Sequence, residues 1–348
     1  SPSRGLGDVY KRQDLGLFSN KFTLGLDFYE SNKKNMLFPM VIPPINGAGS
    51  SATVVLNAGN MRNRGVELTL GHRNRVGKVN YNVNMTFSKN ENKVTEMGGA
   101  SNMYYFSDGK PVTTGSSDLV TVIKEGYEAG AFFVMPTDGI INTEQKLVEY
   151  QKLKSNARMG DLIYVDRNGD GKISDDDRVY GGSGMPECEV GLNMGASYNG
   201  FDFSMNWYAS IGNEIINGSK IYAYQSHTHK DLIYQWSYVN PTSMIPTYKG
   251  SSHDNYRAYA DRWVEDGSFV RLKNIILGYS LPKKAIMRIG LNKCRFYLAA
   301  DNLLTLTKYT GYDPEVGSNG LSKRGLDLGT YPISVQMRGG FQLSLIHI

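Results

Sequence analysis

Apolar and polar residues alternate along several stretches of the chain. In Phe201–Ile211, FDFSMNWYASI, the odd positions are apolar and the even positions carry polar groups. Val79–Ser88, VNYNVNMTFS, follows the same rule. Because alternate side chains of a strand point to opposite faces, each stretch predicts a β-strand with one apolar and one polar face. The pattern recurs in five further segments, residues 22–28, 66–70, 190–198, 294–300 and 333–345.

Weaker patterns bring the predicted number of strands to about ten. Residues 268–282 alternate with a slip of register near Asn274, and residues 119–124 with 129–135 predict a hairpin. The connections differ strongly in length, and short ones alternate with long ones. The short ones are residues 73–77, 199–200 and 281–290, and the long ones are residues 31–61, 92–118, 137–185, 214–267 and 308–330.

This alternation of connections favours a membrane barrel over a soluble sandwich. Outer-membrane barrels have short turns on one side and long extracellular loops on the other. Their strands are apolar on the outer face and polar on the inner face. A soluble β-sandwich also has alternating strands, but five long loops argue against a compact soluble domain. The predicted fold class is therefore all-β, a transmembrane antiparallel β-barrel segment with long extracellular loops. Aromatic residues near strand ends fit interfacial girdles: Tyr29, Tyr198, Phe201 and Tyr279.

Composition narrows the function classes. The net charge of +5 comes from scattered Lys and Arg residues without a basic stripe, which argues against nucleic-acid binding. The two cysteines, Cys188 and Cys294, match no zinc or redox spacing. No apolar run reaches the length of a spanning helix, and no signal peptide is visible.

The segment Asp166–Asp177, DRNGDGKISDDD, matches the spacing of a calcium-binding loop. In such loops, oxygen ligands come from fixed positions and a central Gly allows the sharp turn. Asp177 is shorter than the usual final Glu, so a solvated turn is the alternative interpretation. The expected cofactor is Ca²⁺, and the candidate ligands are Asp166, Asn168, Asp170, Lys172 through its carbonyl, Ser174 and Asp177.

The context of this loop argues against a calcium sensor. The preceding GDLIYV reads as extended chain and the following RVYGGSGMP is rich in Gly, so no helix pair flanks the loop. The expected role of the segment Asp166–Asp177 is to make an extracellular loop rigid. His227 and His229 lack a third metal ligand, and no catalytic motif is present, so no enzymatic activity is predicted.

Four long motifs resemble one protein family. They are DRWVEDGSFVRLKNIILGYSLP (residues 261–282), FYLAADNLLTLTKYTGYDPEVG (296–317), NAGNMRNRGVELTL (57–70) and GDLIYVDRNGDGKISDDDRVYGG (160–182). In this order they resemble the C-terminal barrel region of SusC/RagA-type TonB-linked outer-membrane transporters of Bacteroidetes. The resemblance covers residues 14–344, nearly the whole chain.

The resemblance implies a 22-stranded barrel in the cell outer membrane, with a plug, of which this chain would supply about ten strands. It implies import of oligosaccharides or peptides, energy supplied through the TonB complex, and a SusD-like surface lipoprotein as a lid. No plug, TonB-contacting segment or signal peptide is recognised, so the chain is interpreted as a transporter fragment. Residues 1–13 and 345–348 resemble no strand of the family and are interpreted as non-native flanks.

Loop aromatics are the candidate contacts for a glycan or peptide substrate. Packing within the loops or contact with the lid is the alternative role for the seven candidates: Tyr104, Tyr105, Phe106, Tyr222, Tyr224, Trp236 and Tyr238. Two other functions remain open, a soluble calcium-dependent β-sandwich adhesion or carbohydrate-binding module and a secreted carbohydrate-active enzyme. A sandwich would bury Met85, Phe203, Met205 and Trp207 between two sheets.

Overall fold

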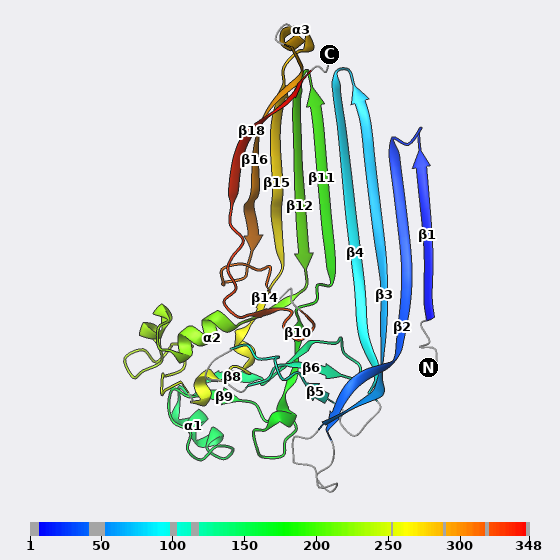
Figure 1. Cartoon of the computed structure of the whole chain (residues 1–348). Coiled ribbons are helices and arrows are strands. Elements are labelled where there is room, and N and C mark those ends of the chain that lie inside the picture. Colours follow the sequence, from blue (N-terminus) through cyan, green and yellow to red (C-terminus); the bar gives the residue numbers. More distant parts are fainter. Residues whose placement is uncertain are drawn as a thin grey trace.

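A single antiparallel sheet of nine strands dominates the chain (Figure 1). The computed structural model describes residues 7–41, 53–97, 103–112, 118–251, 253–287, 290–316 and 320–345. Neighbouring strands in the sheet follow the order of the chain, as in a meander. The strands are β1 (Gly7–Leu17), β2 (Phe22–Val41), β3 (Thr53–Val76), β4 (Val79–Met97), β11 (Cys188–Tyr198), β12 (Phe201–Ile211), β15 (Phe269–Ser280), β16 (Leu291–Thr307) and β18 (Gln336–Leu345).

The predicted alternation of short and long connections is confirmed. All short turns lie at one end of the sheet, at the top of Figure 1, and all long loops lie at the other. The β11–β12 turn is Asn199–Gly200, and both residues have positive φ, 47° and 90°. Such a turn matches the twist of a hairpin and requires residues that tolerate the left-handed region. The third helix, α3 (Lys283–Ile286), lies in the turn between β15 and β16.

The predicted slip of register near Asn274 is also confirmed. Against β12, Lys273 is an extra residue between Leu272 and Asn274 and forms a β-bulge. Against β16 the pairing shifts at the same place, but there the extra residue lies on β16. A bulge adds one residue to one strand and restores the alternation on the far side. The apolar residues on either side of Lys273 therefore keep facing outward.

Three strand predictions need correction. Residues 7–13, predicted to fit no strand, form part of β1, which pairs along its whole length with β2. Residues 31–61, predicted as a long loop, are mostly strand because the β2–β3 backbone ladder continues from Lys33–Met61 to Val41–Thr53. The hairpin at residues 119–135 exists but belongs to a separate small sheet. The interpretation of residues 1–13 and 345–348 as non-native flanks stays a prediction.

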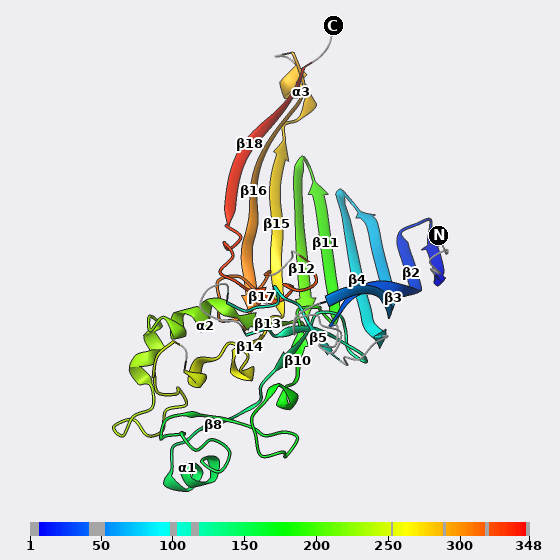
Figure 2. The ribbon, with the colours of Figure 1, turned by 60° about the horizontal axis from the view of Figure 1, so that its bottom comes forward.

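The long loops fold into a compact loop-side domain (Figure 2). It contains three small sheets, with strand orders β10-β7-β6-β5, β14-β13-β17 and β8-β9. Its buried apolar core joins distant loops, with Phe132, Ile216, Tyr256 and Trp263 each at most 1% exposed. Its elements are β5 (Met103–Tyr105), β6 (Thr121–Lys124), β7 (Ala131–Val134), β8 (Thr137–Ile140), α1 (Glu144–Tyr150), β9 (Leu162–Tyr164), η2 (Asp175–Asp177), β10 (Val179–Ser183), β13 (Glu214–Asn217), α2 (Gly218–Gln225), η3 (Lys230–Tyr234), η4 (Asp254–Tyr256), η5 (Asp261–Trp263), β14 (Val264–Asp266) and β17 (Leu326–Asp327).

The two-sheet sandwich is not found in the described part of the chain. Among the residues that a sandwich would bury, Met85, Phe203, Met205 and Trp207 belong to none of the buried apolar clusters. Each of these side chains is partly exposed. The large sheet therefore has one apolar face that no second sheet covers.

Candidate functional site: the two faces of the sheet and its outer rim

The strand registers place one kind of side chain on each face of the sheet. One row across neighbouring strands is apolar and consists of Leu70, Met85, Leu192 and Trp207. The row one residue further along is polar and consists of Asn84, Asn193, Asn206, Asn274 and Asp301. The Asn274 amide donates a hydrogen bond of 2.5 Å to Asp301. The apolar face suits lipid and the polar face suits a wet lumen.

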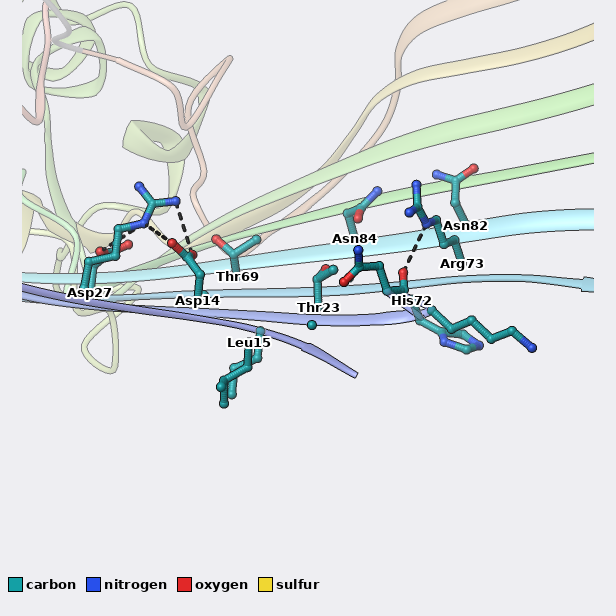
Figure 3. Close-up of a pocket in the computed structure, with 16 residues that line it drawn as sticks. Asp14, Leu15, Thr23, Asp27, Thr69, His72, Arg73, Asn82 and Asn84 are labelled. Atoms are coloured by element: carbon teal, nitrogen blue, oxygen red, sulfur yellow. Dashed lines mark hydrogen bonds and ion pairs between the residues drawn. The ribbon is translucent and has the colours of Figure 1, made fainter. Parts of the chain in front are cut away.

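A polar trough of about 630 Å³ lies on the lumen face of β1–β4 (Figure 3). In the figure, Asp14, Thr69 and Asn84 project to one side of the sheet, whereas Leu15 and His72 project to the other. Arg12 binds Asp14 at 2.8 Å, and the Tyr10 hydroxyl donates to Asp27 at 2.7 Å. Hydrogen-bonding and charged groups thus line this part of the wall.

The lumen face also carries cross-strand ion pairs. The Arg295 guanidinium on β16 makes a two-point contact with Asp202 on β12, with Nε donating to Oδ1 at 2.9 Å. Arg338 on β18 binds Asp301 at 2.7 Å. These pairs fix long side chains against the wall, and charge on this face needs no burial in lipid.

A buried ion cluster fastens the last long loop to the barrel wall. Arg271 on β15, with its side chain 3% exposed, contacts Asp313 at 2.6 Å and Glu315 at 2.8 Å. It also donates to the Thr305 hydroxyl at 2.9 Å. Asp313 accepts the backbone N–H groups of Glu315 and Ile333 as well. No motif in the sequence links Arg271 to Asp313, because the two residues are 42 positions apart.

A second anchor holds the start of the same loop. Glu265 on β14 accepts hydrogen bonds from the backbone and hydroxyl of Thr310, and from Lys220 on α2 at 3.0 Å. Burial opposes ionisation of Glu265, but the donors at Thr310 and Lys220 lower its pKa. In the same way, burial opposes ionisation of Asp313, while the N–H groups of Glu315 and Ile333 and the Arg271 guanidinium lower its pKa.

Lowering the pH should detach residues 308–316 from the wall of the sheet. Both carboxylates have lowered pKa values in the folded state, so their stabilisation is present above their unfolded pKa values, about 4, and is lost as the pH falls through the folded values. We expect residues 308–316 to stay protected from hydrogen exchange at pH 7 and to lose protection below about pH 4 before the large sheet does. Loss of protection on raising the pH from 5 to 8 would contradict this assignment.

The loop Asp166–Asp177 is closed by its own backbone. The Asp166 carboxylate accepts the N–H groups of Gly169 and Gly171 at 2.7 and 2.8 Å. The fully buried Asp177 accepts those of Arg167, Asn168 and Ser174 at 2.8–3.2 Å. Neighbouring η2 starts with a capping box between Ser174 and Asp177.

The hydrogen bonds to Asp166 and Asp177 involve two of the residues predicted to bind calcium. Asp166 and Asp177, the expected end ligands, direct both carboxylate oxygens to backbone N–H groups. Among the described residues, no group of three or more His, Cys, Asp or Glu side chains is placed to hold a metal ion. Calcium binding stays a prediction, which calorimetric titration of the parent and an Asp166→Ala variant would test.

Replacing Asp177 should disorder this loop without any metal. We expect Asp177→Ala to destabilise the loop by about 2–4 kcal/mol, because three N–H groups lose their acceptor in a buried setting. Hydrogen exchange of residues 166–178 in a chelator-containing buffer measures the effect. The matched control is Asp176→Ala, since Asp176 is exposed and its carboxylate accepts no hydrogen bond from the described residues. Equal exchange in the two variants would contradict the assigned role of Asp177.

The seven aromatic candidates do not gather at one place. Tyr224 and Trp236 are 3% and 4% exposed and pack in the loop-side domain, whereas Tyr222 and Tyr238 are 53% and 79% exposed. The other three are partly buried on or beside β5: Tyr104, Tyr105 and Phe106. Packing within the loops accounts for the buried members, and substrate contact stays a prediction for the set.

The two candidate histidines serve aromatic packing. His227 stacks on Tyr248 with ring centroids 4.2 Å apart, and His229 stacks on Tyr224 at 4.4 Å. The His229 Nδ1 atom also accepts the N–H of Asp231. Each ring thus has its own aromatic partner.

The chain is similar in sequence and in fold to several known receptors and transporters. No family model matches the chain. It is 29% identical over 328 residues to TonB-dependent receptor P3 of Formosa agariphila, covering 92% of this chain and 32% of that protein. It is 27% identical to TonB-dependent receptor SusC of Bacteroides thetaiotaomicron, covering 95% of this chain and 31% of that protein. A solved structure of the RagAB peptide transporter superposes with a TM-score of 0.76 at 24% identity, over 97% of this chain and 35% of the other.

The resemblance to SusC/RagA-type receptors is confirmed. A second solved structure, the RagAB peptide importer in an "open-open" state, superposes with a TM-score of 0.73 at 26% identity. The fold is thus the predicted one, a segment of a β-barrel of the SusC/RagA type with long loops at one end. The chain spans about a third of the length of these SusC/RagA-type relatives.

Within the described ranges, none of the helices combines the length and the apolar character needed to cross a membrane.

Proposed function

We propose that this chain forms part of the wall and the outer loops of an outer-membrane transporter that imports oligosaccharides or peptides. One observation carries the proposal: the large sheet is apolar on one face and polar on the other, and all its long loops lie at one end. An uncovered apolar face is unfavourable in water and matches the lipid-facing wall of a barrel. The relatives are named as receptors and transporters, and none is named as an enzyme.

The proposed partners follow from the same relatives. A SusD-like surface lipoprotein would cover the loop-side domain, TonB would supply energy through a part of the receptor outside this chain, and lipid would surround the apolar face. The solved relatives are named as the RagAB peptide transporter and importer, which supports a peptide substrate. The resemblance to SusC/RagA-type transporters keeps an oligosaccharide substrate open. No enzymatic activity is proposed.

Deletion of the complete gene in its own bacterium tests this function. We expect uptake of either labelled oligosaccharides or labelled peptides to fall, to recover on complementation, and to disappear when a protonophore collapses the proton gradient. A surface lipoprotein should co-purify with the affinity-tagged receptor from outer membranes. Unchanged uptake of both substrate classes, with the protein recovered in the soluble secreted fraction, would contradict the proposal.

A further inference from the structure

Positive charge gathers at the end of the sheet where the short turns lie, called here the turn-side end. In its described segments, residues 17–22, 73–79, 198–202, 279–287 and 290–295, the only acidic residue is Asp202, which pairs with Arg295. The loops at the other end hold most of the acidic residues of the chain. The turn-side lysines are Lys21, Lys78, Lys283, Lys284 and Lys293.

The ammonium groups of these five lysines are exposed. None of the five side chains makes a hydrogen bond or an ion pair with the described residues. Two arginines at the same end bind only backbone carbonyls: Arg73 donates to Asn20 at 3.1 Å and Arg75 to Gly77 at 3.0 Å. Bonds to neutral carbonyls leave both guanidinium charges uncompensated. The turn-side end thus carries a concentrated net positive charge.

Large apolar side chains lie beside this charge. Exposed residues at the ends of the same strands include Phe22, Val76, Tyr198, Phe201 and Phe296. The rings of Phe201 and Tyr279, on neighbouring strands, lie 4.5 Å apart between centroids. A lysine next to an apolar girdle can lay its methylene stem on the girdle and extend its ammonium group into the polar layer. The combination matches the boundary between acyl chains and headgroups of a bilayer.

The helix α3 extends this basic surface. Lys283 and Lys284 form its first turn and are exposed, while Ile286 is buried against the sheet end and the neighbouring Met287 is 59% exposed. In Figures 1 and 2, α3 lies beyond the ends of the strands, on the side opposite the loop-side domain. The helix that carries Lys283 and Lys284 therefore lies further along the strand direction than the other short turns.

We propose that the turn-side end binds the anionic headgroups of phospholipids in the leaflet that faces the short turns. The proposal rests on the membrane placement given under the proposed function, and adds a lipid class and a set of residues. Clustered ammonium groups attract anionic headgroups through a potential that falls off within a Debye length, so the attraction is sensitive to salt. Such binding would fix the depth of the wall in the bilayer.

Vesicle flotation of the 348-residue chain tests the proposal. The chain, folded in a non-ionic detergent, is mixed with vesicles of phosphatidylcholine alone or with about one quarter phosphatidylglycerol, and the floating fraction is measured. We expect the parent to prefer the phosphatidylglycerol vesicles by about tenfold at low salt and to lose most of that preference at high salt. Replacing the five turn-side lysines by Gln should abolish it, whereas Lys→Arg at the same positions should retain it.

A charge-matched variant controls for net charge. It carries Gln at five loop-side lysines, Lys146, Lys152, Lys172, Lys230 and Lys308, and should keep the preference. An equal loss in both Gln variants, or a parent preference that is absent or indifferent to salt, would overturn the proposal. Unchanged preference in the turn-side variant would also overturn it. Failure to insert into either vesicle contradicts the proposed function instead.

Discussion

Replacing Arg271 by Met is expected to destabilise the attachment of residues 308–335 by about 3–5 kcal/mol, the usual effect of removing one partner from a buried ion pair. The guanidinium is 3% exposed and Asp313 is 7% exposed, so the variant would leave a carboxylate buried without its cation. Two further contacts, to Glu315 and Thr305, would be lost with it. Thermal unfolding in detergent and hydrogen exchange of the loop measure the effect.

The bulge residue beside it supplies the control. Lys273 contacts Glu315 at 2.6 Å, but both side chains are about a third exposed. Lys273→Met should therefore cost no more than about 1 kcal/mol. A double variant, Arg271→Met with Asp313→Leu, should recover part of the loss because no unpaired charge stays buried. Similar small losses in both single variants would show that Arg271 is not the anchor.

Arginine at Leu192 is expected to block membrane assembly, while arginine at the next position is tolerated. Leu192 lies in the apolar row between Met85 and Trp207, so the charge would enter lipid at a cost of about 2–4 kcal/mol near the midplane. Asn193 lies in the polar row between Asn84 and Asn206, where a charged group meets water. Heat-modifiable migration and urea titration of the vesicle-folded variants measure the difference. Equal costs at the two positions would contradict the assignment of faces.

The sheet could be predicted from the sequence where alternation is strict. The pattern in β4, β11 and β12 identified both faces, and the predicted slip of register near Asn274 coincides with the bulge at Lys273. β1 escaped prediction because its pattern, with Lys11 and Gln13 among the apolar positions, is weak and its pairing with β2 depends on backbone groups. The outer part of the β2–β3 ladder escaped for a different reason: MLFPMV (residues 36–41) and TVVL (residues 53–56) are almost entirely apolar, so they lack the alternation that marks the other strands.

The loop-side domain was beyond single-sequence reasoning. Its core brings together residues such as Phe132, Ile216 and Trp263, which are far apart in the chain and carry no shared period. The Arg271–Asp313 pair is equally non-local. The segment Asp166–Asp177 was recognisable from its residue spacing. The hydrogen bonds from its backbone N–H groups to the carboxylates of Asp166 and Asp177 depend on the path of the backbone, which residue spacing does not determine.

Fluorescence quenching by brominated lipid tests the central claim most directly, namely that the apolar face of the sheet meets lipid. In a chain without Cys188 and Cys294, a fluorophore is attached at Met205→Cys or at Asn206→Cys, adjacent positions on opposite faces of β12. The account predicts strong quenching by brominated acyl chains at position 205 and strong quenching by aqueous iodide at position 206. Protection of position 205 from both quenchers, as in a dry core between two sheets, would contradict it.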